Sequence, residues 1–214
     1  MNLPKVKECD RTKFILEHCT GKRVLHLGCA DWPFTEKKAK KTNFLHKLIT
    51  EVSEDTLGVD ISSIGIDIMR NYNIKNVTTV DAEIPLRMSI GGEFDVVVAG
   101  EILEHVLNAG ALLESIKGVM NRKSILIITT PNFSPIKRIP RLALRIEEVH
   151  PDHVYYFSYS TLSKLLQLSG YEIIDFNTHW WDVGFVSKVV NKIFRNIPCL
   201  QYYADTLCVS ARLR

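Results

Sequence analysis

The most constraining feature of the sequence is a short apolar run that leads directly into a turn of small residues. Residues 21–31 read GKRVLHLGCAD, in which 23–27 predict a buried strand and 28–30 a tight turn. A strand that is apolar along its length is typical of a parallel sheet covered on both faces. A second apolar run, TLGVD, ends at Asp60. Because parallel strands end at one edge of a sheet, we expect the turn and the Asp60 carboxylate to lie together.

Apolar runs alternate with amphipathic segments along the chain. This alternation predicts a parallel sheet with right-handed helical crossovers. We expect strands at residues 23–27, 56–60, 76–80, 93–99, 124–130, 171–178 and 205–213. We expect helices at residues 10–19, 34–52, 63–72, 102–120, 160–168 and 186–195. The predicted fold is α/β, Rossmann-like and doubly wound, with a mostly parallel seven-stranded sheet, an antiparallel last strand and helices on both faces.

Length and composition indicate an ordinary globular protein. The 214 residues, 46% of them hydrophobic, fit a single domain spanning 1–214. A net charge of +3 is too weak to indicate a nucleic-acid partner. Five cysteines without CxxC spacing indicate reduced thiols and a cytoplasmic protein. The polar start predicts no secretory signal, and no apolar run approaches the ~18 residues of a membrane span.

The alternation breaks between residues 132 and 158, which are rich in proline, arginine, histidine and aromatic residues. We expect this segment to be a lid or acceptor-binding insertion over the carboxyl ends of the strands, or else a structural loop. It contains the basic residues Lys137, Arg138, Arg141 and Arg145 among apolar ones. Such a segment fits an anionic acceptor, phosphates or peripheral membrane contact, with a solvated surface helix as the alternative.

Aromatic residues gather in and after this segment. They wall a hydrophobic acceptor pocket in one interpretation and belong to the core in the other. The residues concerned are Tyr155, Tyr156, Phe157, Tyr159, Trp180, Trp181 and Phe185.

Six segments in order resemble class I S-adenosylmethionine (SAM)-dependent methyltransferases. They are VLHLGCAD, LGVDIS, VDAEIPL, FDVVVAGEILEHV, ILIITTPN and DHVYYFSYSTLSKLLQLSGY, which together span nearly the whole chain. Within that class, the LEHV segment and the histidine before an aromatic run most resemble ubiquinone-biosynthesis O-methyltransferases. A dinucleotide dehydrogenase fits less well, because the LEHV and VDAE segments are similar to those of methyltransferases.

The resemblance implies SAM contacts at the ends of four strands. The turn after the first strand is expected to line the methionine part of SAM, and the carboxylate at the end of the second strand to bind the ribose hydroxyls. The end of the third strand is expected to face the adenine, and the end of the fourth strand to lie under the sulfonium. The implied contact residues are His26, Gly28, Cys29, Ala30, Asp60, Ile61, Asp81, Ala82, Glu83, Gly100 and Glu101.

The first turn departs from the family pattern. The family usually carries an acidic residue where His26 stands, and glycines where Ala30 and Trp32 stand. An acidic group there helps to hold the amino group of SAM, which a histidine does weakly or not at all. Alanine and tryptophan leave less room than glycine for a close backbone approach.

An acid and histidine cluster follows the fourth strand. If a helix starts here, Glu101, Glu104 and His105 share one face. With His153, or with His150, they could hold a magnesium ion, as two methyltransferase groups with similar segments do. Alternatively, His105 or His153 is the general base that takes a proton from the acceptor. The simplest alternative is that these side chains only cap and pack.

The sequence therefore predicts methyl transfer from SAM to a small-molecule acceptor, hydrophobic or anionic, at an oxygen. The first alternative is a metal-dependent RNA 2′-O-methyltransferase, which the modest charge disfavours. The second is a methyltransferase-like binding protein without activity, which the residues at 26, 30 and 32 motivate. The oligomeric state is not predicted.

Overall fold

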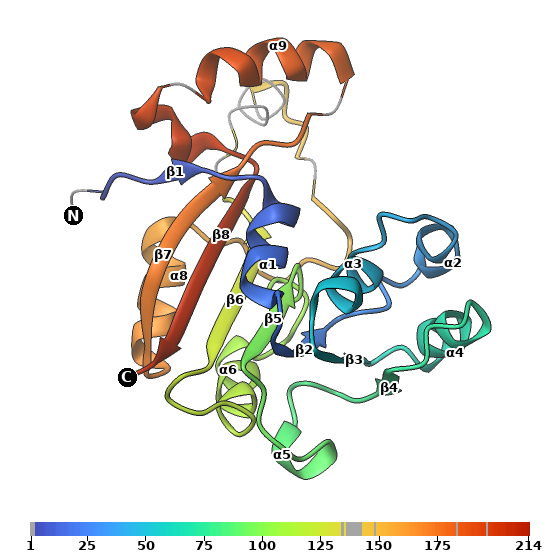
Figure 1. Cartoon of the computed structure of the whole chain (residues 1–214). Coiled ribbons are helices and arrows are strands. Elements are labelled where there is room, and N and C mark those ends of the chain that lie inside the picture. The colour runs from blue at the N-terminus through green and yellow to red at the C-terminus, as the bar shows by residue number, and fades with distance from the viewer. Residues whose placement is uncertain (1–2, 134, 136–142, 148, 183, 196) are drawn as a thin grey trace.

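The computed structural model describes residues 3–133, 135, 143–147, 149–182, 184–195 and 197–214. Its centre is an eight-stranded sheet of order β1-β7-β8-β6-β5-β2-β3-β4 (Figure 1). The strands are β1 Lys7–Glu8, β2 Arg23–Leu27, β3 Asp55–Asp60, β4 Val77–Thr79, β5 Val96–Gly100, β6 Ile125–Pro131, β7 Tyr171–His179 and β8 Thr206–Leu213.

Helices connect the strands, and several of them are short. They are α1 Arg11–Cys19, α2 Thr35–Ala39, α3 Leu45–Val52, α4 Ser63–Asn71, α5 Leu86–Ser89, α6 Ala109–Lys117, α8 Tyr159–Leu168 and α9 Gly184–Phe194, with the 3-10 helix η2 Pro198–Tyr203. Among the described residues, no helix combines the length and apolar character that crossing a membrane requires.

Strand pairing confirms the predicted class of sheet. All pairs among β2 to β6 are parallel, whereas β8 is antiparallel to both β6 and β7. The order reverses at β2, which pairs with β3 on one side and β5 on the other. In open α/β sheets, ligands bind at the carboxyl ends of the strands next to such a reversal. The topology therefore predicts a ligand site at the carboxyl ends of β2, β3 and β5.

Both faces of the sheet are buried because successive residues of a strand point to opposite sides. On β5, Val97 and Ala99 pack with α6 and α8, while Val96 and Val98 pack with α1 and α3. Figure 1 shows α1 and α3 on one side of the sheet and α6 and α8 on the other. This two-sided burial explains why the strands read as nearly continuous apolar runs.

The structure corrects three details of the predicted elements. An eighth strand, β1, pairs parallel with β7; its two residues are exposed, so no apolar pattern marked it. The helix expected over 34–52 is two helices, α2 and α3. The helix expected over 102–120 begins only at Ala109. Asn108 is its N-cap, and the Asn108 side chain accepts a hydrogen bond from the Ala111 N–H.

Candidate functional site

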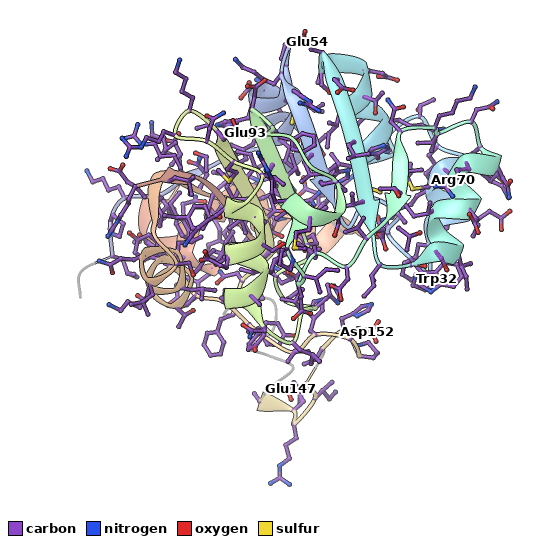
Figure 2. All side chains as sticks on the ribbon, turned by 90° about the horizontal axis from the view of Figure 1, so that it is seen from below. Trp32, Glu54, Arg70, Glu93, Glu147 and Asp152 are labelled. Carbon is purple, nitrogen blue, oxygen red and sulfur yellow. The ribbon has the colours of Figure 1, made fainter. Side chains whose placement is uncertain are left out.

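A cavity of about 790 Å³ lies at the carboxyl ends of β2, β3 and β5. Figure 2 shows Trp32 and Asp152 at this end of the strands, and Glu54 and Glu93, which precede β3 and β5, at the other end. The volume falls within the range of small-molecule sites, roughly 300–1,000 Å³. Ten of the eleven residues expected to contact the cofactor line it, namely His26, Gly28, Cys29, Asp60, Ile61, Asp81, Ala82, Glu83, Gly100 and Glu101.

The turn after β2 accommodates the two departures from glycine. Gly28 adopts φ +68°, a conformation that favours glycine, and Asp31 also has a positive φ of 58°. Ala30 is fully buried and does not line the cavity. Its side chain faces α4, where a Cβ added to Gly65 would lie 2.8 Å from the Ala30 Cβ. Trp32 lines the cavity with its side chain about half exposed, so neither substitution fills the space.

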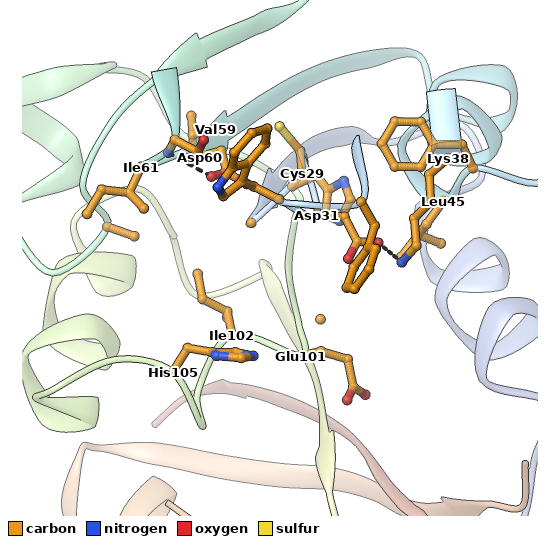
Figure 3. Close-up of a pocket in the computed structure, with 18 of the residues that line it drawn as sticks. Cys29, Asp31, Lys38, Leu45, Val59, Asp60, Ile61, Glu101, Ile102 and His105 are labelled. Atoms are coloured by element: carbon orange, nitrogen blue, oxygen red, sulfur yellow. Dashed lines mark hydrogen bonds and ion pairs between the residues drawn. The ribbon is translucent and has the colours of Figure 1, made fainter. Parts of the chain in front are cut away.

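Asp60 is fixed at the end of β3 by two backbone N–H groups. Oδ2 accepts a hydrogen bond from the Ala30 N–H at 2.9 Å, and Oδ1 accepts one from the Ser62 N–H at 2.9 Å. Each carboxylate oxygen keeps a second lone pair, so the group can still accept from a pair of hydroxyls. In Figure 3, Asp60 and Ile61 lie across the cavity from Glu101, Ile102 and His105. This arrangement fits a ribose between the ends of β3 and β5.

The acidic residues after β4 have structural contacts of their own. Asp81 accepts a hydrogen bond from the Glu83 N–H at 2.9 Å. The Glu83 carboxylate accepts from the Leu107 N–H at 3.2 Å and the Asn108 N–H at 2.9 Å. Glu83 therefore lines the cavity and also ties it to the 102–108 turn.

Positively charged residues that the sequence analysis missed reach the cavity from α1 and α2. The Arg11 guanidinium lies 3.4 Å from Glu101 and donates to the Thr129 hydroxyl at 3.0 Å. Lys38 forms an ion pair with Asp31, shown by the dashed line in Figure 3. Burial and then the Arg11 charge lower the pKa of Lys38. No local sequence signal marks Arg11, because its role depends on α1 packing across β5 and β6.

His26 meets a second buried histidine rather than a carboxylate. Its Nδ1 lies 3.1 Å from the Nδ1 of His46 on α3, and the two rings stack. Burial lowers the pKa of His46 to about 4. Burial, the His46 charge and the Arg11 charge together hold the pKa of His26 well below its ordinary value. Both rings are therefore neutral at pH 7, with one donating and the other accepting the shared hydrogen bond.

The predicted helical face of Glu101, Glu104 and His105 does not form. Residues 102–108 are a turn, and Glu101 adopts a positive φ of 55°, outside helical geometry. Glu104 points into the interior, 1% exposed, where the Thr130 hydroxyl donates to it at 2.9 Å. Burial, reinforced by Glu101, raises the pKa of Glu104 well above its ordinary value. The reason for the correction is that α6, capped by Asn108, starts about two turns later than the apolar pattern indicated.

The structure does not bring all the predicted metal ligands together either. Among the described residues, the group with potential ligand atoms within 4.8 Å of one another consists of His105, His150 and His153. Glu101 and Glu104 are not members of that group. His105 and His150 line the cavity, together with Asp152. The two predicted catalytic histidines, His105 and His153, thus meet with ring centroids 4.7 Å apart.

The residues of the predicted insertion and the predicted aromatic group have different positions in the structure. Phe157 and Trp180 are buried in the core, whereas Trp181 lines the cavity. His150 and Asp152 carry part of the insertion to the cavity wall, as a lid would require. Four further residues of these predictions, Lys137, Arg138, Arg141 and the side chain of Phe185, lie outside the described part of the chain.

Comparison with known proteins gives the family. The family model described as a methyltransferase domain matches residues 6–175. No curated protein matches the sequence. A SAM-dependent methyltransferase from Archaeoglobus fulgidus shares 18% identity and a TM-score of 0.62, with 94% of this chain and 91% of that chain covered.

Two further similar structures were solved with S-adenosylhomocysteine (SAH). Magnesium protoporphyrin IX methyltransferase from Synechocystis shares 14% identity and a TM-score of 0.58, covering 95% of this chain and 82% of that one. An N-methyltransferase from Bradyrhizobium japonicum shares 13% identity and a TM-score of 0.57, covering 95% and 85%. These identities show the fold alone, and the resemblance to ubiquinone-biosynthesis enzymes stays a prediction. The chain therefore belongs to the methyltransferase domain family, and its fold is that of SAM-dependent methyltransferases.

Proposed function

We propose that this chain binds SAM in the cavity and methylates a small-molecule acceptor at an oxygen. When bound, SAM supplies a methyl group activated by a sulfonium. The single observation that carries the proposal is the Asp60 carboxylate, fixed by the N–H groups of Ala30 and Ser62 at the cavity wall. A carboxylate fixed in this way binds a pair of ribose hydroxyls without further reorganisation.

Carboxylates also line the cavity, but its basic residues would favour an anionic acceptor. Arg11, Lys38 and Lys41 line it beside the aromatic side chains of Phe34 and Trp181. Arg11 and Lys38 are paired with carboxylates, so an acceptor carboxylate or phosphate would share or replace those partners. The aromatic residues suit an apolar body next to the charge. An acceptor that combines an acidic group with an apolar or aromatic body fits this wall.

His105 is the residue best placed to take the acceptor's proton. Its Nδ1 lies 3.2 Å from the Asp152 carbonyl oxygen. A carbonyl only accepts hydrogen bonds, so Nδ1 carries a proton, and in the neutral form of the ring the lone pair is on Nε2. A neutral imidazole with a free lone pair at the cavity wall is a suitable general base. His153, packed against it, is the second candidate.

Isothermal titration of the purified chain with SAH tests the proposal. Wild type should bind at one site, and Asp60→Ala should bind more weakly because a charged hydrogen-bond acceptor is lost. Such a bond contributes about 1.5–3 kcal/mol, which is roughly 10- to 150-fold in Kd. The matched control is Asp67→Ala, which removes an exposed carboxylate of α4 that pairs with Arg70.

This titration, together with an assay of methyl transfer, decides between the rival hypotheses. Absence of SAH binding by correctly folded wild type would favour a methyltransferase-like binding protein without activity. Equal binding by Asp60→Ala and Asp67→Ala would remove the observation on which the proposal depends. Methylation of RNA ends in preference to small acids would favour the RNA alternative.

A further inference from the structure

Three histidines from two segments of the chain converge at the rim of the cavity. His105 comes from the turn after β5, and His150 and His153 come from the segment before α8. The ring centroids lie 4.7 Å apart for His105 and His153, 5.0 Å for His150 and His153, and 5.7 Å for His105 and His150. One nitrogen from each ring lies within 4.8 Å of the others. We call these residues the histidine cluster.

Backbone hydrogen bonds hold the two segments against each other. The N–H groups of Val154 and Tyr155 donate to the Glu104 carbonyl oxygen at 2.8 and 3.3 Å. The Asp152 carbonyl oxygen accepts from His105, as described above. These contacts fix the relative position of the histidine cluster's two halves before any ligand binds. Preorganisation of this kind lowers the entropy cost of gathering the three rings.

The hydrogen bond to the Asp152 carbonyl also orients the His105 ring for a metal. Metal-binding histidines commonly donate one ring N–H to a carbonyl or carboxylate while the other nitrogen binds the ion. His150 is held more weakly, by a 3.3 Å hydrogen bond from the Asp152 N–H to its Nδ1. A metal can replace that long contact at little cost. The exposed position of His150 leaves its ring room to move towards the other two.

We propose that His105, His150 and His153 form a binding site for a transition-metal ion of the zinc class. Neutral imidazoles suit Zn²⁺, Co²⁺, Ni²⁺ or Cu²⁺, whereas Mg²⁺ takes oxygen ligands. Three protein ligands leave a fourth tetrahedral position for water or an exogenous group. Zn–N bonds of about 2.0–2.1 Å require nitrogens roughly 3.4 Å apart. Because the ligand atoms now lie within 4.8 Å of one another, the histidine cluster must close by up to about 1.4 Å to reach that geometry.

This site differs from the magnesium site that the sequence indicated. That site needed the carboxylates of Glu101 and Glu104, but Glu104 is buried beneath the turn and Glu101 pairs with Arg11. The new site uses His150 in their place. Because a ring nitrogen that binds a metal cannot also take up a proton, a loaded site removes both general-base candidates, His105 and His153. The proposal of a metal site itself does not depend on the identity of the acceptor.

Titration calorimetry on the chelator-treated full chain tests the proposal. Zn²⁺ should bind with a stoichiometry of one, and Mg²⁺ under the same conditions should not bind. His105→Ala and His150→Ala should each weaken Zn²⁺ binding by at least about tenfold, since even outer-sphere changes at metal sites have effects of 10- to 100-fold. The matched controls are His18→Ala on α1 and Cys199→Ser, which removes an exposed thiol.

Cobalt absorption supplies a readout of the ligand set. Co²⁺-loaded wild type should show the intense visible bands of a four-coordinate site, and His150→Ala should lose them while keeping its circular dichroism spectrum. Zn²⁺ binding unchanged in His150→Ala but lost in Glu101→Gln would overturn the proposal, as would tighter binding of Mg²⁺ than of Zn²⁺. A parallel SAH titration reports on the adenosyl pocket, so failure of the metal site is distinguishable from failure of the proposed function.

Discussion

Two buried histidines, His26 on β2 and His46 on α3, are joined by a hydrogen bond beside the cavity. The space around them is tight, since a Cβ on Gly58 would lie 2.6 Å from the His46 ring. Burial keeps both rings neutral, so in the proposed complex His26 would present the amino group of SAM with a neutral ring in place of an acid. In this proposal, recognition of SAM depends more heavily on Asp60 and the turn after β2.

This pair should make stability depend on pH. The pKa of His46 is lowered from 6.5 to about 4, so the unfolded chain takes up a proton there before the folded chain does. The free energy of unfolding should therefore fall as pH decreases from 6.5 towards 4. Between pH 7 and pH 5, we expect a loss of about 2 kcal/mol from His46 alone.

Urea unfolding at the two pH values measures the loss. The double variant His26→Leu, His46→Leu replaces both partners with apolar groups and should flatten the dependence. His18→Leu on α1 is the control and should keep the wild-type slope. A double variant as sensitive to acid as wild type would contradict the assignment.

At the scale of elements, the 102–108 turn links Glu83, which follows β4, to the insertion before α8. Glu83 binds the N–H groups of Leu107 and Asn108 at the end of this turn, and the Asn108 side chain caps α6. At the other side, the turn carries His105 to the cavity and the Glu104 carbonyl to the insertion. If residues 102–108 formed a helix, His105 and the Glu104 carbonyl would point in other directions and would lose these contacts. The late start of α6 is therefore part of how the site is built.

Asn108→Ala should destabilise the chain through loss of this cap. The expected cost is about 1 kcal/mol, which lowers the Tm of a protein of this size by roughly 2–4 °C. Thermal unfolding followed by circular dichroism measures it. Asn108→Ser retains an N-cap oxygen and should unfold near the wild-type temperature. If the alanine variant keeps the wild-type Tm, the cap does not limit stability.

At the scale of the molecule, the cavity lies where the strand order reverses, with β3 and β4 on one side and β5 and β6 on the other. Residues of α1, of α2 and of the segment at 150–152 also line it. A ligand that touches all of these parts binds only the folded chain. Ligand binding should therefore be coupled to global stability.

SAH should raise the melting temperature of wild type. At a free concentration 100-fold above Kd, binding adds about 2.7 kcal/mol, equivalent to roughly 5–10 °C for a chain of this length. Differential scanning fluorimetry with and without SAH measures the shift. Asp60→Ala at the same SAH concentration should shift much less, whereas Asp67→Ala should match wild type. An unshifted wild type would argue against an adenosyl site.

Local patterns in the sequence were sufficient to predict most strands and the turn after the first of them. The apolar runs predicted seven of the eight strands because burial on both faces leaves little choice of residue. The turn at Gly28 follows from the backbone preference of a single residue. Ten of the eleven residues that the family resemblance implied as cofactor contacts line the cavity, and their contact with a cofactor stays a prediction.

Only the tertiary structure decided which distant residues meet. Arg11 at Glu101, His46 at His26, and His150 beside His105 depend on how helices and the insertion pack onto the sheet. Strand β1 exists because β7 offers it an edge, although its own residues carry no apolar pattern. The separation of Glu104 from the histidine cluster followed from one capping residue. Periodicity and spacing describe neighbours along the chain, whereas these contacts are fixed by packing between segments far apart in sequence.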